Sequence, residues 1–140
     1  MKRHHELIHK FVEDSLQSGI IQLMPTSFKP WIQMPIMLVT NRKARMCHDG
    51  GVSKKAEHYS TPVKMESFAE IFNCCPRATP FCKLDDSKGF NQMWIRTESR
   101  DLCAFKWKNR IFTYRASNFG EPKHPACYQR ANMVLTNLLR

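Results

Sequence analysis

Two adjacent carboxylates are the residues of this sequence best suited to chemistry. Asp85 and Asp86 follow the short apolar run 81–84, which predicts a strand, and Gly89 shortly afterwards predicts a turn. Mg²⁺ prefers one or two carboxylates together with phosphate oxygens and water, so this pair is of the kind that holds a hard cation. Taken alone, the pair also fits a solvated strand end or a turn initiator, and that simpler interpretation stays open.

The cysteines and histidines offer less. The six cysteines are irregularly spaced without a C-x-x-C pair, whereas a structural zinc site needs ligands at short paired intervals. His5 and His9 lie four residues apart and could share one helix face, but no second pair joins them. The N-terminus lacks the apolar run of a signal peptide, so we expect no disulfide framework. We interpret these residues as buried thiols and solvated histidines.

The charge balance points to polyanionic partners. The 140 residues include 22 Lys and Arg against 12 Asp and Glu, which gives a net charge of +10 and favours nucleic acid by counterion release. Apolar residues make up 42% of the chain, which is enough for the core of one compact domain or a piece of a larger one. No stretch approaches the roughly 20 apolar residues of a membrane span. We therefore expect an intracellular chain, cytoplasmic or nuclear, with no membrane partner.

Hydrophobic spacing in the first half predicts a helix and then a hairpin. Apolar residues at helical spacing over 6–18, followed by Gly19 as a cap, predict a helix and then a short extended piece at 20–23. The apolar run 35–40 predicts a buried strand, and 45–48 a returning strand beyond the basic turn 41–44.

The second half predicts further elements in a mixed order. We expect a polar linker over 53–61, a helix over 63–72, a strand at 81–84, and a short helix or extended segment over 90–97. Alternation over 102–114 around a turn at 108–110 predicts a β-hairpin. A helix from 125 to the end has an apolar stripe of Tyr128, Ala131, Leu135 and Leu138. The fold class is therefore α+β, and the stripe running to the last residues suggests that a longer protein is normal for this sequence.

Five segments together resemble retroelement reverse transcriptases. Phe81-Cys82-Lys83-Leu84-Asp85, followed by Gly89-Phe90-Asn91-Gln92, resembles motif A, in which F-x-K-L-D leads into x-x-x-G-[YF]-x-Q. Similar matches are found in the opening helix and G-I-I turn (14–21), the fingers hairpin (35–49), the hairpin between motifs A and B (98–114), and motif B (118–129). The double Asp at 85–86 and the run Glu98-Ser99-Arg100 with Phe105-Lys106-Trp107 most resemble gypsy-like or DIRS-like retrotransposons. The resemblance implies a partial domain over 1–140, with fingers mostly in 1–80 and part of the palm, an incomplete antiparallel sheet packed with helices, in 81–140.

The resemblance also implies roles at motif A. Asp85 matches the carboxylate that binds both catalytic Mg²⁺ ions, which stabilise the attacking 3′-hydroxyl and the departing pyrophosphate. Asp86 stands where the family uses a backbone carbonyl, so its side chain is expected to be spare. Phe90 matches the aromatic gate against a ribose 2′-hydroxyl, although an ordinary core Phe is the simpler alternative.

Further roles fall on the fingers and on motif B. Arg45 and Lys43 match cations that hold the incoming triphosphate, where the alternative is a solvated hairpin tip. Phe119 and Gly120 match the turn that lies against nucleotide and template, where Gly permits close backbone approach. Gln129 matches a polar residue on the following helix. The implied partners are an RNA or DNA primer–template and dNTP.

The sequence departs from the family where catalysis is most demanding. Gly51 replaces the usual Arg, Ser53-Lys54 replaces Leu-Asn, and Asn118 replaces the Pro that opens motif B. The [YF]-x-D-D turn of motif C, with the remaining catalytic carboxylates, occurs nowhere in the sequence. We therefore expect a reverse-transcriptase fragment that does not polymerise DNA alone and is marginally stable. The alternatives are a non-catalytic basic nucleic-acid-binding module, and an unrelated small α+β interaction domain.

Overall fold

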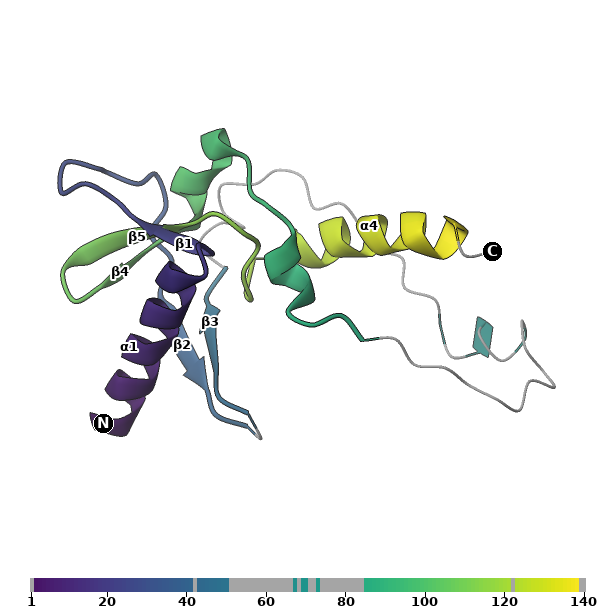
Figure 1. Ribbon diagram of the computed structural model, residues 1–140, viewed down its shortest axis with the longest axis horizontal. Helices are drawn as coiled ribbons and strands as arrows, with labels where there is room; N and C mark the ends of the chain where they lie inside the picture. Colours follow the sequence, from purple (N-terminus) through teal and green to yellow (C-terminus); the bar gives the residue numbers. More distant parts are fainter. Residues whose placement is uncertain are drawn as a thin grey trace.

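The computed structural model describes residues 2–41, 43–50, 67, 69–70, 73, 85–121 and 123–138. Figure 1 shows the arrangement of its elements. In chain order they are α1 (Lys2–Gln17), β1 (Ile21–Leu23), β2 (Ile36–Val39), β3 (Arg45–His48), the 3-10 helices η1 (Gly89–Gln92) and η2 (Thr97–Cys103), β4 (Ala104–Trp107), β5 (Arg110–Tyr114) and α4 (His124–Leu138). None of the described helices is both long enough and apolar enough to span a membrane.

Helix α1 confirms the first predicted helix and begins four residues earlier than expected. It ends in a Schellman motif, in which the Ile20 N–H donates to the Ser15 carbonyl (2.9 Å) and the Gly19 N–H donates to the Leu16 carbonyl (3.1 Å). Gly19 adopts a φ of 70°, the left-handed conformation that this cap requires. The cap turns the chain sharply from α1 into β1.

A three-stranded antiparallel sheet forms the centre of the molecule. Its order is β1–β5–β4, with Ile21 opposite Tyr114 and Phe105 opposite Phe112. Phe105 and Phe112 are almost completely buried and stack with ring centroids 5.4 Å apart. The apolar stripe of α1 packs on the same core through Ile8, Val12 and Leu16. This core joins residues about 100 positions apart in the sequence.

The β4–β5 hairpin confirms the strongest local pattern in the sequence. Its loop has two residues, since Trp107 pairs with Arg110, and the loop residues Lys108 and Asn109 have φ values of 46° and 61°. Two positive φ angles define a type I′ turn, whose twist matches that of the flanking strands. The predicted turn over 108–110 was one residue too long, because Arg110 already belongs to β5.

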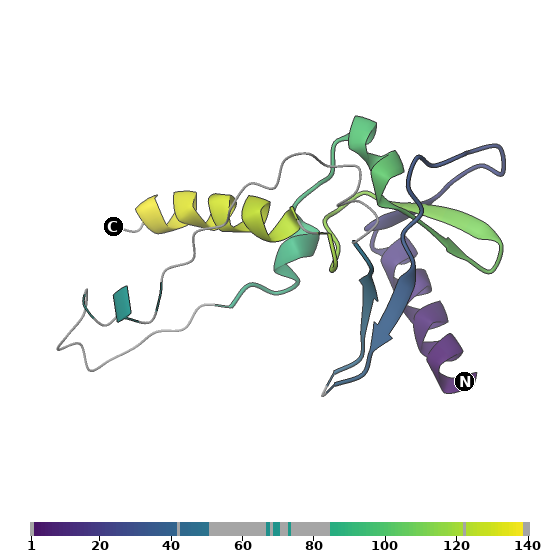
Figure 2. The same cartoon turned by 180° about the vertical axis from the view of Figure 1, so that it is seen from behind.

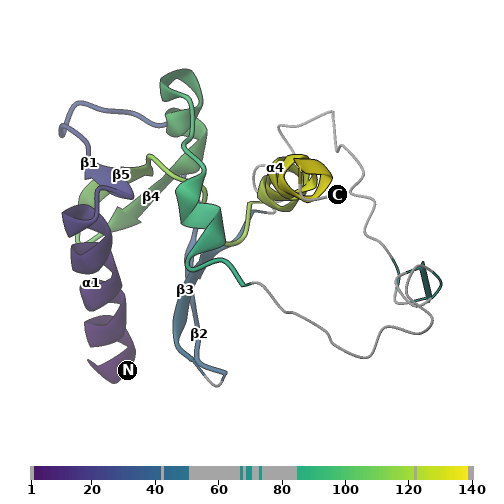
Figure 3. The same ribbon diagram turned by 45° about the vertical axis from the view of Figure 1, so that its right-hand side comes forward.

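The β2–β3 hairpin is present as predicted, with Ile36 opposite His48 and Val39 opposite Arg45. The Met34 N–H, just before β2, donates to the Ala104 carbonyl of the central sheet (2.8 Å). The expectation of a buried strand at 35–40 was wrong, because Met37 and Val39 on one face are 46% and 41% exposed. Figures 1, 2 and 3 show the hairpin projecting from the sheet in the same direction as the N-terminal end of α1.

Helix α4 confirms the last predicted helix, although one residue of its predicted apolar stripe is exposed. Ala131, which the stripe placed on the apolar face, is exposed, as are Met133 and Val134. Figures 1 and 2 show α4 extending away from the sheet on the side opposite α1, with η1 beside its N-terminal end. Helical spacing predicts an amphipathic helix but does not tell whether the sheet reaches its apolar face.

Between Asp85 and β4 the chain is largely 3-10 helical. The segment predicted as helical or extended over 90–97 is the last part of η1 followed by extended chain, and η2 was not predicted at all. The predicted strand 81–84 and linker 53–61 lie outside the described residues. So does most of the predicted helix 63–72, of which Ser67 and Glu70 are described and form a reciprocal capping pair. The α+β class is confirmed as a mixture of helices and antiparallel sheets.

Candidate functional site

Three aromatic side chains from distant parts of the sequence meet next to the two carboxylates. The Phe90 ring of η1 lies edge-to-face with Phe119, with centroids 5.2 Å apart, and with Tyr128 of α4 at 5.1 Å. Such edge-to-face pairs add to the stability that comes from burial. We call Phe90, Phe119 and Tyr128 the aromatic cluster. The structure therefore brings two predicted site residues, Phe90 and Phe119, into direct contact.

The acidic turn is anchored to this cluster by Tyr128. The Tyr128 hydroxyl donates to Oδ2 of Asp86. A Cβ at Gly89 would overlap the Tyr128 ring, so glycine permits η1 to pack this closely on α4. Asp85 and Asp86 are both exposed. The Asp86 side chain, expected to be spare in the metal site, accepts this hydrogen bond.

The pKa of Tyr128 reflects this acidic environment. A hydrogen bond with Asn132 acts to lower the pKa. The hydrogen bond to Asp86, together with desolvation and the negative charges of Asp86 and Asp85, outweighs that effect and raises the Tyr128 pKa. Tyr128 therefore remains a hydroxyl donor at neutral pH.

The turn that carries Phe119 is fixed against the β2–β3 hairpin. The His48 N–H donates to the Phe119 carbonyl (3.0 Å). Gly120 has a φ of 111°, and a Cβ there would overlap the His48 carbonyl oxygen. Gly120 thus meets both conditions that favour glycine, namely a left-handed backbone and close approach to another backbone segment.

His48 connects this turn to the central sheet. The side chain is 1% exposed, and its Nε2 lies 2.7 Å from the Tyr114 hydroxyl oxygen of β5. Burial lowers the pKa of His48 to about 4, against a smaller opposite effect of the Pro35 backbone carbonyl. Burial likewise raises the pKa of Tyr114, so both partners are neutral near pH 7.

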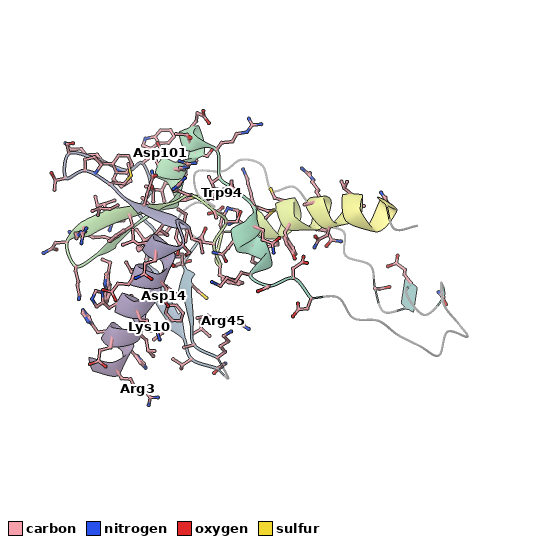
Figure 4. The ribbon with its side chains drawn as sticks, in the orientation of Figure 1. Arg3, Lys10, Asp14, Arg45, Trp94 and Asp101 are labelled. Carbon is pink, nitrogen blue, oxygen red and sulfur yellow. The ribbon has the colours of Figure 1, made fainter. Side chains whose placement is uncertain are left out.

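The two cations predicted to hold the triphosphate lie apart from the aromatic cluster. Arg45 pairs with Val39 on the β2–β3 hairpin, and both Arg45 and Lys43 are exposed. Figure 4 shows Arg45 on this hairpin, well removed from Trp94 and α4. Across the described residues, no hydrogen bond, ion pair or ring contact joins these two cations to the aromatic cluster. Gln129 is half-buried on α4, next to Tyr128 in sequence.

The described residues do not form a complete metal site. Within them, no three His, Cys, Asp or Glu side chains gather closely enough to hold an ion. Asp85 is exposed and can offer carboxylate oxygens to a hard cation, whereas Asp86 is engaged by Tyr128. Mg²⁺ readily takes one or two carboxylates, with phosphate and water as its other ligands. The residues present therefore fit a partial magnesium site.

The sequence patterns did not indicate a role in the site for His48 or Gly89. His48 was read only as a strand residue and Gly89 only as a turn residue, although both set the spacing between elements. The sequence offers one signal, namely that His48 follows Met46 and Cys47 in a predicted strand. Its partner Tyr114 lies 66 residues away, so no local pattern could pair them.

Comparison with solved structures shows which known proteins have a similar fold. No family profile and no curated protein sequence matches the chain. Among solved structures, it is similar to the foamy virus protease–reverse transcriptase in complex with an RNA/DNA hybrid, with a TM-score of 0.74 and 18% identity over 98% of this chain and 18% of that one. It is also similar to a mutant of the prototype foamy virus enzyme, with a TM-score of 0.73 and 21% identity over 95% of this chain and 18% of that one. A foamy virus complex with double-stranded DNA gives a TM-score of 0.70 and 21% identity over 91% of this chain and 26% of that one.

The chain therefore has a reverse-transcriptase-like fold. It spans about a fifth to a quarter of the length of these enzymes. This likeness gives no support for a small α+β domain of a different fold, one of the alternatives from the sequence. The similarity is to retroviral enzymes, and it gives no support for the finer gypsy-like or DIRS-like placement.

Proposed function

We propose that this chain is a segment of a reverse transcriptase that helps to bind primer–template and incoming nucleotide. The observation that carries the proposal is the contact of Phe90 with Phe119 beside Asp85 and Asp86. Residues that resemble motifs A and B thus meet at one place in a fold shared with reverse transcriptases. In this assignment residues 1–80 are mostly fingers and 81–140 are part of the palm.

Each residue of the site has a role in this proposal. Phe90, held edge-to-face by Phe119, gates the sugar of the nucleotide by excluding a 2′-hydroxyl. Gly120 brings the backbone close to nucleotide and template. Arg45 and Lys43 attract the triphosphate, which their exposure on the β2–β3 hairpin supports. Gln129 is the weakest assignment, because it rests on its motif position alone.

The proposal includes magnesium but no polymerisation by these residues alone. Asp85 would hold Mg²⁺, which in this class of enzyme supplies charge stabilisation for transfer of a nucleotide. A two-metal site needs further carboxylates. The described residues hold no group of three possible metal ligands, and the sequence contains no [YF]-x-D-D tetrapeptide. We therefore expect no primer extension by the 140-residue chain with Mg²⁺ and dNTP.

Binding to an RNA/DNA primer–template, measured by fluorescence anisotropy over a salt series, tests the proposal. The printed names of the similar structures include complexes with DNA and with an RNA/DNA hybrid, which supports this choice of partner. The logarithm of the affinity should fall linearly with the logarithm of salt, with a slope near −0.9 per phosphate contact. Loss of two contacts in Lys43→Ala/Arg45→Ala should reduce that slope by roughly 2.

The matched control is Arg3→Ala/Lys10→Ala, which removes the same charge from exposed positions on α1. If both double variants reduce the slope equally, the binding reflects net charge and not the proposed site. Absence of binding at low salt would overturn the proposed function. Primer extension by the unmodified chain would overturn the expected inactivity.

A further inference from the structure

The acidic turn and helix α4 are joined by contacts that involve one side chain. The Tyr128 hydroxyl donates to Asp86, the hydroxyl and ring of Tyr128 leave no room for a side chain at Gly89, and the ring lies edge-to-face with Phe90. Tyr128 therefore contacts three positions within five residues of the turn. Figures 1 and 2 show η1, the element that follows this turn, beside the N-terminal end of α4.

We infer that Tyr128 is a positioning residue that fixes the Asp85–Asp86 turn on α4 through its hydroxyl group. The hydrogen bond holds Asp86, and Asp85 next to it stays exposed and available to a ligand. The two neighbouring carboxylates thus have different tasks, one structural and one for binding. This inference rests on the proposed function only for the use to which Asp85 is put.

Geometry separates the hydroxyl group from the ring. The contact with Phe90 is made by the ring, and Tyr128→Phe keeps it, whereas both the ring and the hydroxyl of Tyr128 lie against Gly89. The contact with Asp86 is made by the hydroxyl alone, and Tyr128→Phe removes it. The hydroxyl also has a hydrogen bond with Asn132, so an effect of Tyr128→Phe reports all interactions of the hydroxyl, and substitutions of Asp86 single out the bond to the turn.

The amides of Asn91 and Met93 provide a local readout. Their N–H groups donate to the carbonyls of Lys88 (2.8 Å) and Phe90 (3.1 Å), so their hydrogen exchange requires the turn and η1 to open. In NMR-detected exchange on the whole chain, without nucleic acid or metal, Tyr128→Phe should exchange both amides roughly 3- to 10-fold faster. Amides of β5 should be unchanged, and so should all of these amides in the control Arg130→Ala, a variant at an exposed position of α4.

Substitutions of Asp86 complete the test. Asp86→Asn keeps a carbonyl acceptor for Tyr128 and should retain most of the protection, whereas Asp86→Ala should lose it. The double variant Tyr128→Phe/Asp86→Ala should exchange no faster than Tyr128→Phe, because Asp86→Ala then removes a hydrogen bond that is already absent. Wild-type exchange in Tyr128→Phe, or additive effects in the double variant, would overturn the inference. Since no ligand takes part, failure of nucleic acid binding would count against the proposed function alone.

Discussion

His48 is the buried side chain whose chemistry most clearly affects stability. Its pKa in the folded protein is about 4, below the 6.5 of an exposed histidine. Between these two values the unfolded chain takes up a proton that the folded chain does not, so stability rises with pH there. The contribution of neutral His48 is complete above pH 6.5 and is lost as the pH falls toward 4.

We predict that the free energy of unfolding falls by about 2 kcal/mol through His48 when the pH is lowered from 7 to 5. His48→Gln removes the titrating group and should flatten the dependence by that amount, although it also lowers stability at pH 7. Urea unfolding at several pH values measures both effects. His4→Gln, at an exposed position on α1, is the matched control substitution. Parallel curves for His48→Gln and the wild type would contradict the assignment.

Gly120 allows a second prediction at the scale of single residues. In Gly120→Ala the new Cβ meets the His48 carbonyl at a positive φ of 111°, and the backbone must shift. We expect a loss of about 3 kcal/mol in the free energy of unfolding.

Gly19→Ala is the matched control for this substitution. Gly19 also has a positive φ, of 70°, but the nearest atom to a new Cβ is a terminal nitrogen of Arg115 at 3.8 Å. This variant bears only the conformational cost, about 1 kcal/mol. Equal losses in the two variants would show that the contact between Gly120 and His48 is not tight.

At the scale of elements, the β4–β5 hairpin has the correct turn type but not the residues that favour it most. A type I′ turn prefers Asn-Gly, whereas this chain has Lys108-Asn109 at the two positive φ positions. Lys108→Asn/Asn109→Gly should therefore raise the free energy of unfolding by about 1 kcal/mol. Asn109→Ala should lower it by a similar amount, and urea unfolding measures both. A loss of stability in the Asn-Gly variant would contradict the assigned turn.

The elements predicted well from the sequence are those defined by short-range patterns. The Gly19 cap, the alternation around Lys108 and Asn109, and the run before Asn41 each specify a boundary within a few residues. The α+β class also agrees with the mixed order of helical and strand patterns in the sequence. In these cases the residues that form the sequence pattern are also the residues that form the structural element.

The remaining features depend on contacts that no local pattern encodes. Alternation placed Met37 and Val39 in a strand, but their exposure depends on whether another element covers that face. Ala131 lies on the predicted apolar stripe of α4 and is nevertheless exposed. The pairing of Asp86 with Tyr128 spans 42 residues, and that of His48 with Tyr114 spans 66. Such pairs become visible only when the fold is known.

At the scale of the whole molecule, the described elements are packed very unequally. Helix α1 and the strands β1, β4 and β5 share one buried core. Helix α4 packs on η1 at its N-terminal end, and Met133 and Val134 farther along are 50% and 60% exposed. Figure 1 shows this helix projecting from the rest of the described structure. Because local stability follows buried apolar contacts, the two parts should open with different free energies.

We predict that amides of α4 beyond Asn132 exchange with solvent roughly 100-fold or more faster than those of β5, measured by NMR on the whole chain. Tyr114 and Phe112 of β5 are 4% and 2% exposed, so their strand opens only when the core unfolds. The first turn of α4 serves as an internal control, since Ala126 is buried and its neighbours should be intermediate. Equal protection along α4 and β5 would mean that the helix unfolds together with the core. The aromatic cluster, which joins α4 to η1, would then carry more of the total stability than its few contacts indicate.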